Sequence, residues 1–139
     1  LLDRAHQHFG YSILIDAHSM PHEAILNAST GFHTSQLVLG DRYGASCSPD
    51  IVNNLAMLIS KNGLHASRNI PFSGAYIVQK YGRPELNRHA IQLEIDRSMY
   101  MDERKIQKLE KFYKLKNKLL NILRDFSKTH TSITSIAAE

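Results

Sequence analysis

Through most of the chain, short apolar runs alternate with polar segments that contain glycine. Residues 11–17 and 36–39 are rich in Ile, Leu and Val, a composition typical of buried strands. Residues 64–69 are a further strand candidate. Residues 89–100 alternate, which puts Ile91, Leu93 and Ile95 on one face of a strand and, on the other, Ala90, Gln92, Glu94 and Asp96.

Helices are predicted in three places. Residues 1–9 are predicted to be the last part of a helix that ends at Gly10. A second helix is predicted to start at Ser48-Pro49-Asp50 and to end near Asn62. A long helix is expected over residues 103–126, with an apolar stripe of Ile106, Leu109, Phe112, Leu119, Leu120, Leu123 and Phe126. Residues 22–33 are interpreted as a loop, and residues 71–84 as a loop with one helical turn. Strands interleaved with helices predict a three-layer α/β sheet.

The length of 139 residues suits a single domain. Residues 1–126 are assigned to it, and the Ser/Thr/Ala-rich residues 127–139 are expected to fray. The chain lacks an initiator Met and opens inside a predicted helix, so a fragment or truncated gene product is expected.

Composition argues against two classes of function, membrane association and nucleic-acid binding. No apolar run approaches the roughly 18 residues that a membrane span needs, so no membrane association is expected. Cys47 is the single cysteine, which favours a reducing, cytoplasmic compartment. Much of the net charge of +4 comes from lysines and an arginine within residues 105–124, where helical spacing indicates a solvated face. Aromatic residues spaced to stack bases are missing there, so nucleic acid is not expected as a partner.

His18 is the first candidate for chemistry. It follows an apolar strand, with Asp16 before it and Ser19 after it, and open α/β sheets bind ligands at the carboxyl ends of their strands. Neutral imidazole is a good zinc ligand. A hydrogen-bonded loop histidine is the alternative, because neither HExxH nor paired cysteines accompany it.

Glu94 is the second candidate, because it lies inside an apolar strand. Burial there would raise the pKa of the carboxyl group and suit it to act as a general base. An ion pair with Arg97 or another arginine is the alternative.

Arginines near turns and strand ends suggest an acidic substrate, because guanidinium binds carboxylates through two parallel N–H bonds. The candidates are Arg42, Arg68, Arg83 and Arg97. Surface ion pairing is the alternative for each. Asp41 is expected to orient such an arginine or to cap a turn. The remaining polar candidates are interpreted as structural or exposed: His33, His65 and His89, with Cys47 as a small buried residue before a helix.

Taken together, these segments resemble the N-formylglutamate amidohydrolases, specifically their C-terminal half. The matching segments occur in the family's order: residues 14–21 (LIDAHSMP), 37–47 (LVLGDRYGASC), 68–71 (RNIP), 81–84 (YGRP), and 89–97 (HAIQLEIDR) with 99–103 (MYMDE).

The resemblance implies a fold similar to the zinc carboxypeptidases: a three-layer α/β/α domain with a mixed, mostly parallel sheet, here truncated. It implies hydrolysis of N-formyl-L-glutamate, or a similar N-acyl amino acid, to formate and L-glutamate, a step of histidine degradation. His18 matches a metal ligand and Glu94 the general base towards water on a divalent metal, expected to be zinc. The four arginines would hold the substrate carboxylates, with support from Asp16, Ser19, Asp41 and Asn69.

Family members are about twice this length, and their other metal ligands belong to an N-terminal half. The chain is therefore expected to be inactive by itself, with a separate N-terminal half as a potential partner. Two alternatives stay open: a non-catalytic remnant or split-enzyme subunit that binds a partner, and a small basic binding module. The sequence also predicts that His18 and Glu94 share one cleft and that at least two of the four arginines line it.

Overall fold

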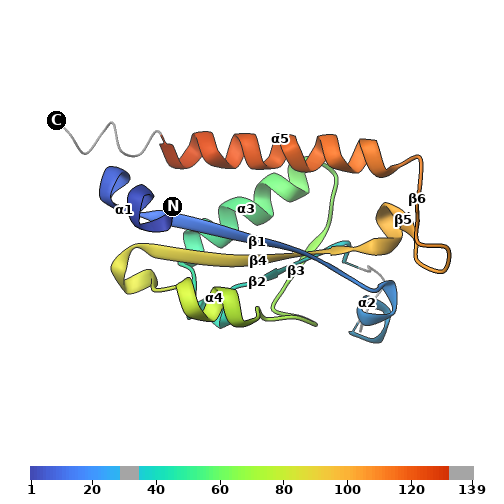
Figure 1. Cartoon of the computed structure of the whole chain (residues 1–139), viewed down its shortest axis with the longest axis horizontal. Helices are drawn as coiled ribbons and strands as arrows, with labels where there is room; N and C mark the ends of the chain where they lie inside the picture. Colours follow the sequence, from blue (N-terminus) through green and yellow to red (C-terminus); the bar gives the residue numbers. More distant parts are fainter. Residues whose placement is uncertain (29–34, 132–139) are drawn as a thin grey trace.

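A computed structural model of the chain describes residues 1–28 and 35–131 (Figure 1). His33 and residues 132–139, to which sequence expectations were attached, lie outside these ranges. No helix among the described residues has the length and apolar character needed to cross a membrane.

A four-stranded mixed sheet forms the middle layer. Its strand order is β1-β4-β2-β3, built from β1 (Ser12–Met20), β4 (Arg88–Asp96), β2 (Leu37–Gly40) and β3 (Ala66–Arg68). β1 and β4 run parallel, as do β2 and β3, whereas β2 is antiparallel to β4. The sheet is therefore mixed and mostly parallel, as predicted.

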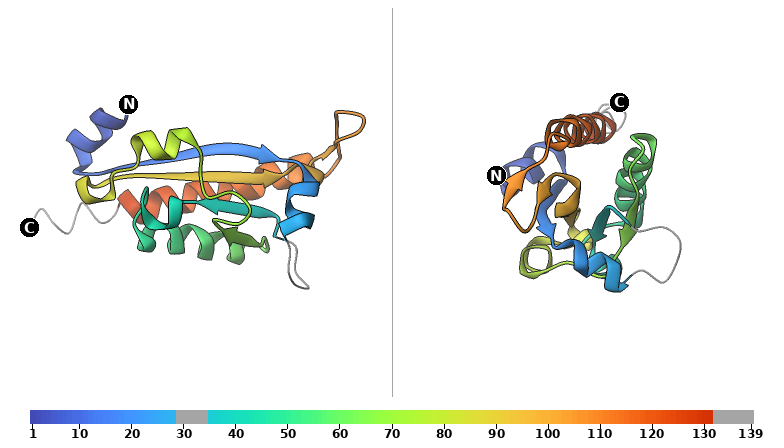
Figure 2. Two further views of the ribbon diagram at one scale, coloured as in Figure 1. Left: turned by 90° about the horizontal axis from the view of Figure 1, so that it is seen from below. Right: turned by 90° about the vertical axis from the view of Figure 1, so that its right-hand side faces the viewer.

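Helices cover both faces of this sheet (Figures 1 and 2). One face carries α3 (Pro49–Lys61) and α5 (Phe112–Thr131), and the other carries α2 (His22–Ala28) and α4 (Tyr76–Tyr81). α1 (Leu2–Phe9) leads into β1 and ends at Gly10, whose φ of 74° is the left-handed conformation that glycine tolerates. These layers confirm the α/β/α prediction.

The main core lies between the sheet, α3 and α5. Alternation along β2 and β4 directs Leu37, Leu39, Ile91 and Leu93 to this face. They pack against the apolar faces of the two helices, namely Ile51, Val52, Leu55, Leu58 and Ile59 of α3 and Leu115, Ile122 and Phe126 of α5. A smaller cluster of Met20, Ile25 and Val38 fills the opposite face beneath α2.

Short elements connect these parts. Three 3-10 turns, η1 (Arg42–Gly44), η2 (Pro84–Leu86) and η3 (Arg97–Met99), follow β2, α4 and β4 respectively. A small hairpin of β5 (Met101–Asp102) and β6 (Gln107–Lys108) then leads to α5.

Four expectations about these elements need correction. β1 continues to Met20, so Asp16 and His18 lie within the strand and not in a loop after it. Residues 22–28 form the helix α2 and not a loop, because a helix there buries Ile25 against the sheet. Residues 103–111 include β6 and turns and form no helix. α5 starts at Phe112 and continues to Thr131, past the expected boundary at Phe126.

The apolar stripe predicted for the last helix matches the buried face of α5 only in part. Phe126 is buried, but Ile106 is 81% exposed in the hairpin region and Leu120 is 47% exposed on α5. The residues that complete the buried face are Leu115 and Ile122, which the expected stripe omitted. The lysines of this region lie on the surface, as the sequence predicted.

Candidate active site

Polar side chains of β1 and β4 meet on the face of the sheet that is opposite α5. In the register of the two parallel strands, Asp16 pairs with Gln92 and His18 with Glu94. Paired residues of neighbouring strands point to the same face, so these four side chains form one cluster. Gln92 Nε2 donates to Asp16 Oδ2 at 3.4 Å. His18 and Glu94 thus lie on one face of two neighbouring strands, and the cleft that they are expected to share stays a prediction.

Glu94 carries an unusual carboxylate. The residue is 8% exposed, and its Oε2 is buried without a hydrogen-bond partner in the described part of the chain. Burial raises the pKa of Glu94, with a further contribution from Asp16, while His18 and Arg97 act in the opposite direction. A buried oxygen without a hydrogen-bond partner lowers stability, which makes Glu94 a candidate for a functional role.

His18 lies at the open edge of the sheet, and its side chain is 46% exposed. Its Nε2 is 3.0 Å from Asp16 Oδ1, which fixes the ring and leaves Nδ1 free to bind a ligand. The contact agrees with a supporting role for Asp16, which stays a prediction.

Arg97 is the arginine whose contacts tie it to this cluster. It begins η3, directly after β4, and donates from Nε to Ser19 Oγ at 3.2 Å and from Nη2 to Ser19 O at 3.3 Å. Its charge lowers the pKa of Glu94. Ser19 thus holds the guanidinium beside the end of β1, and its supporting role in a site stays a prediction.

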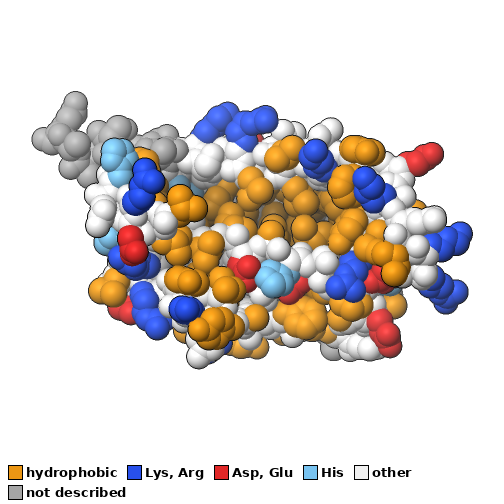
Figure 3. All heavy atoms as spheres, in the orientation of Figure 1, with side chains coloured by type: hydrophobic (Ala, Val, Ile, Leu, Met, Phe, Trp, Pro, Cys, Tyr) orange, Lys and Arg blue, Asp and Glu red, His pale blue; other side chains and the backbone are white. Residues whose placement is uncertain are grey.

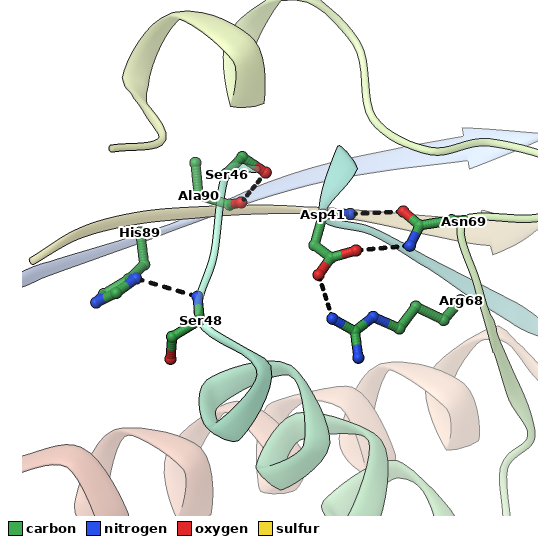
Figure 4. Close-up of polar contacts among 7 residues, drawn as sticks. All are labelled: Asp41, Ser46, Ser48, Arg68, Asn69, His89 and Ala90. Carbon is green, nitrogen blue, oxygen red and sulfur yellow. Dashed lines mark hydrogen bonds and ion pairs between the residues drawn. The ribbon is translucent and has the colours of Figure 1, made fainter. Parts of the chain in front are cut away.

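A second polar cluster ties β2 to β3 (Figure 4). Asp41 is fully buried and forms an ion pair with Arg68. Asn69 donates from Nδ2 to Asp41 Oδ1 at 2.7 Å and accepts from the Asp41 main-chain N–H at 3.0 Å. Asp41 thus orients an arginine, one of the two roles that the sequence suggested. The hydrogen bond to Asp41 raises the pKa of Arg68.

The other two arginines are placed differently. Arg83 donates from Nη1 to Gln79 O at 2.8 Å and to Gly82 O at 2.6 Å. Its main chain forms an isolated antiparallel β-bridge with Arg88 at the start of β4. Glu94 lies six residues further along β4, about 20 Å away at the rise of a strand. Arg42 binds through its main-chain N–H to Ser73 O. Among the described contacts, one of the four arginines reaches the His18–Glu94 pair, where at least two were expected.

His22 belongs to a polar cluster that sequence reasoning missed. Its Nδ1 lies 2.8 Å from Asp96 Oδ2 and 3.2 Å from Ser98 Oγ, and its main-chain N–H donates to Glu103 Oε2 at 3.2 Å. Asp96 is buried on the same strand face as Glu94. The sequence contains a signal for this cluster, because His22 follows His18 by four residues and Asp96 follows Glu94 by two. The interpretation of residues 22–33 as a loop hides it.

Two other candidates are structural, as expected. His89 is buried, and its Nδ1 accepts from the Ser48 main-chain N–H at 3.3 Å, at the start of α3 (Figure 4). Burial lowers the pKa of His89, and the charge of His130 adds to this. Cys47 is buried, and burial raises the pKa of its thiol to about 12, so it is an unreactive core residue.

Residues 1–28 and 35–131 hold no group of three His, Cys, Asp or Glu side chains arranged to bind a metal ion. The donors that are present fit one part of such a site: an imidazole fixed by a carboxylate, next to a buried carboxylate with a free oxygen.

The structure thus defines a three-layer α/β domain whose mixed sheet carries this imidazole and carboxylate on one face. The family model described as N-formylglutamate amidohydrolase matches residues 1–101. Two curated proteins, the N-formylglutamate deformylases of Pseudomonas aeruginosa and Pseudomonas putida, are each 37% identical over 103 residues, which is 73% of this chain. The chain therefore belongs to the N-formylglutamate amidohydrolase family.

A solved structure supports the same assignment. The crystal structure of N-formylglutamate amidohydrolase from Ralstonia eutropha JMP134 matches 94% of this chain with a TM-score of 0.82 and 32% identity. The chain spans 38% of the length of each curated relative and 48% of that crystallised chain.

Proposed function

We propose that this chain forms part of an amidohydrolase that cleaves N-formyl-L-glutamate to formate and L-glutamate. The observation that carries the proposal is the buried Oε2 of Glu94, which has no hydrogen-bond partner among the described residues and lies beside His18 on the neighbouring strand. Family membership and the names of the Pseudomonas relatives support the substrate.

Glu94 would be the general base. Burial raises the pKa of Glu94 above its ordinary value, which makes its carboxylate a stronger base than an exposed one. It would take a proton from a water molecule whose oxygen attacks the formyl carbon. It would then pass that proton to the amide nitrogen as the C–N bond breaks, which releases formate and the amine of glutamate.

His18 would contribute one ligand to a divalent metal, with zinc favoured by the imidazole donor. When bound, such a metal supplies Lewis-acid polarisation of the formyl carbonyl. Asp16 holds the His18 ring for this purpose through its 3.0 Å contact with Nε2. The remaining ligands would come from the part of the family domain that this chain does not span.

Arg97 would bind a substrate carboxylate. Its guanidinium is fixed by Ser19 next to Glu94, which is where an acidic amino acid must lie for its amide to meet the base. We place the reaction in the cytoplasm, within histidine degradation.

The test is a chimera in one polypeptide. It joins this chain to the part of the Pseudomonas aeruginosa deformylase that the match leaves uncovered, and formate release from N-formyl-L-glutamate is measured. We expect turnover that His18→Ala abolishes and that Glu94→Gln lowers about 10²–10⁴-fold. Arg97→Ala should raise KM more than it lowers kcat.

Matched controls are His8→Ala and Glu85→Gln, which change exposed residues outside the site and should leave turnover unchanged. N-formyl-L-glutamine, which lacks one carboxylate, should be a poorer substrate. A folded chimera with bound zinc that releases no formate, or that is indifferent to Glu94→Gln, would contradict the proposal.

A further inference from the structure

The first residue of α2 lies against the segment that carries Arg97. His22 Nδ1 is 2.8 Å from Asp96 Oδ2 and 3.2 Å from Ser98 Oγ. Asp96 and Ser98 are the two chain neighbours of Arg97. Figure 3 shows acidic, basic and histidine side chains gathered over the last part of β1, towards α2. One imidazole in this polar region therefore contacts the residue on each side of the arginine.

The imidazole itself is held in place. Because a carboxylate only accepts hydrogen bonds, the Nδ1 that faces Asp96 carries a proton and donates. The His22 main-chain N–H donates to Glu103 Oε2 at 3.2 Å, which anchors the residue a second time. The side chain of Asp96 is 6% exposed and that of His22 is 39% exposed. The contact thus joins a fixed ring to a buried carboxylate, where a charge-assisted hydrogen bond is strong.

The position of Arg97 depends on such contacts because the turn that carries it is short. η3 has three residues, and a 3-10 turn has poorer hydrogen-bond geometry than an α-helix. Asp96 fixes its start, since Oδ1 accepts from the Ser98 main-chain N–H at 2.9 Å while Oδ2 faces His22. Ser19, three residues before His22, holds the guanidinium. The end of β1 and the start of α2 thus hold both the main chain and the side chain of this arginine.

A contact that only attached α2 to the sheet would not need these polar groups. An apolar cluster already lies beneath α2, formed by Met20, Ile25 and Val38. Apolar pairs of similar size stabilise a buried contact as well as an ion pair does, or better. The hydrogen bond between His22 and Asp96 adds what an apolar contact cannot, a defined direction for the residues that flank Arg97.

We propose that His22 is a positioning residue, which fixes Arg97 through Asp96 in the orientation that binds a carboxylate of the substrate. The identity of that substrate, a dicarboxylic N-acyl amino acid, rests on the proposed function. His22 acts through Asp96 and touches neither the substrate nor a metal in this role. It should therefore set the affinity for the acidic substrate and leave the chemical step nearly unchanged.

The first experiment measures formate release by the chimera described above. His22→Ala should raise KM for N-formyl-L-glutamate about tenfold and change kcat less than about threefold. His22→Asn should restore most of the affinity, because the asparagine amide can donate from the place of Nδ1. His22→Gln, whose amide reaches the place of Nε2 instead, should not. His8→Ala, which removes an exposed imidazole from α1, is the matched control and should change neither constant.

A double-mutant cycle separates positioning from a general effect on the fold. If His22 acts through Arg97, the chimera with both His22→Ala and Arg97→Ala should have the KM of Arg97→Ala alone. Independent effects, whose factors multiply, would overturn the proposal. A His22→Ala variant that lowers kcat without raising KM would overturn it too, as would equal rescue by His22→Gln and His22→Asn.

A second measurement needs no activity. Nitrogen relaxation in the 139-residue chain reports the mobility of the Arg97 Nε–H group. We expect this group to be ordered in the unsubstituted chain, mobile in His22→Ala and ordered again in His22→Asn. The Nε–H of Arg68, which Asp41 holds, is the internal control and should stay ordered in all three. An Arg97 Nε–H that is equally ordered in His22→Ala would contradict the proposal.

The two measurements separate this inference from the proposed function. If His22→Ala mobilises Arg97 but the folded chimera releases no formate, His22 positions the arginine and the proposed activity is lost. If the chimera releases formate with a KM that His22→Ala leaves unchanged, the activity stands and the positioning role is overturned.

Discussion

At the scale of single residues, two buried carboxylates differ in how their oxygens are hydrogen-bonded. Glu94 is buried with one oxygen unpartnered, and Asp41 is fully buried but completely paired. The first arrangement lowers stability and the second raises it, because a buried carboxylate is tolerated when its hydrogen bonds are satisfied. Substitutions at these two positions should therefore shift stability in opposite directions.

Glu94→Gln should stabilise the chain at neutral pH. The pKa of Glu94 in the folded state lies above its ordinary value of 4.5, so the unfolded chain loses the proton first as pH rises. Stability therefore falls as pH rises from 4.5 to the folded pKa. Thermal unfolding by circular dichroism should show the two proteins alike below pH 4.5 and the variant increasingly more stable above it. Glu85→Gln, which alters an exposed carboxyl, is the control; a gain that is the same at every pH would contradict this explanation.

Asp41→Ala should destabilise the chain by about 2–4 kcal/mol, because it leaves Asn69 Nδ2 and Arg68 without their acceptor. Urea unfolding measures the change. Asp125→Ala removes a carboxylate from an exposed pair with Lys128 and should cost about 0.5 kcal/mol. Equal effects of the two substitutions would show that the Asp41 cluster contributes no special stability.

At the scale of elements, α5 shows how a helix can carry two apolar surfaces with different roles. Leu115, Ile122 and Phe126 face the core, while Leu120 and Leu123 face the open groove beside β1. A helical wheel groups all of these as one broad stripe, because positions that are three and four residues apart lie on neighbouring parts of the surface. The two surfaces of α5 differ in how far their side chains are buried, and this depends on how β1 and α3 pack against the helix.

Ile122→Ala should cost about 2–5 kcal/mol of unfolding free energy, since it opens a cavity at a residue that is 2% exposed. Leu120→Ala on the same helix should change it by about 0.5 kcal/mol or less, because that side chain is 47% exposed. Chemical denaturation of both variants checks the difference. A large loss from Leu120→Ala would mean that the groove is already covered in the isolated chain.

At the scale of the whole molecule, the described residues place His18, a candidate metal ligand, beside Glu94, a candidate general base. A single imidazole cannot fix the geometry of a catalytic zinc ion, which normally takes three protein ligands. The open edge of β1 and the incomplete ligand set occur at the same place in the fold.

We therefore expect the 139-residue chain, purified by itself, to hold zinc weakly and to deformylate N-formyl-L-glutamate negligibly. Calorimetric titration with zinc and a formate assay measure the two properties. His18→Ala should remove whatever weak zinc binding is present, and His8→Ala should not. Chelator-sensitive turnover by the chain alone would show that other histidines complete the site, with His22 the first to examine because Asp96 orients it.

The sequence by itself determined the strands, most helices, the layer architecture and the resemblance to one family, because these follow from local periodicity and from ordered motifs. It also made His18 and Glu94 candidates, because His18 follows an apolar run and Glu94 interrupts one. Only the tertiary structure paired His18 with Glu94, joined His22 to Asp96 and separated Arg83 from the site. Strand register and the burial of each helix face arise from contacts between residues far apart along the chain, which no local pattern contains.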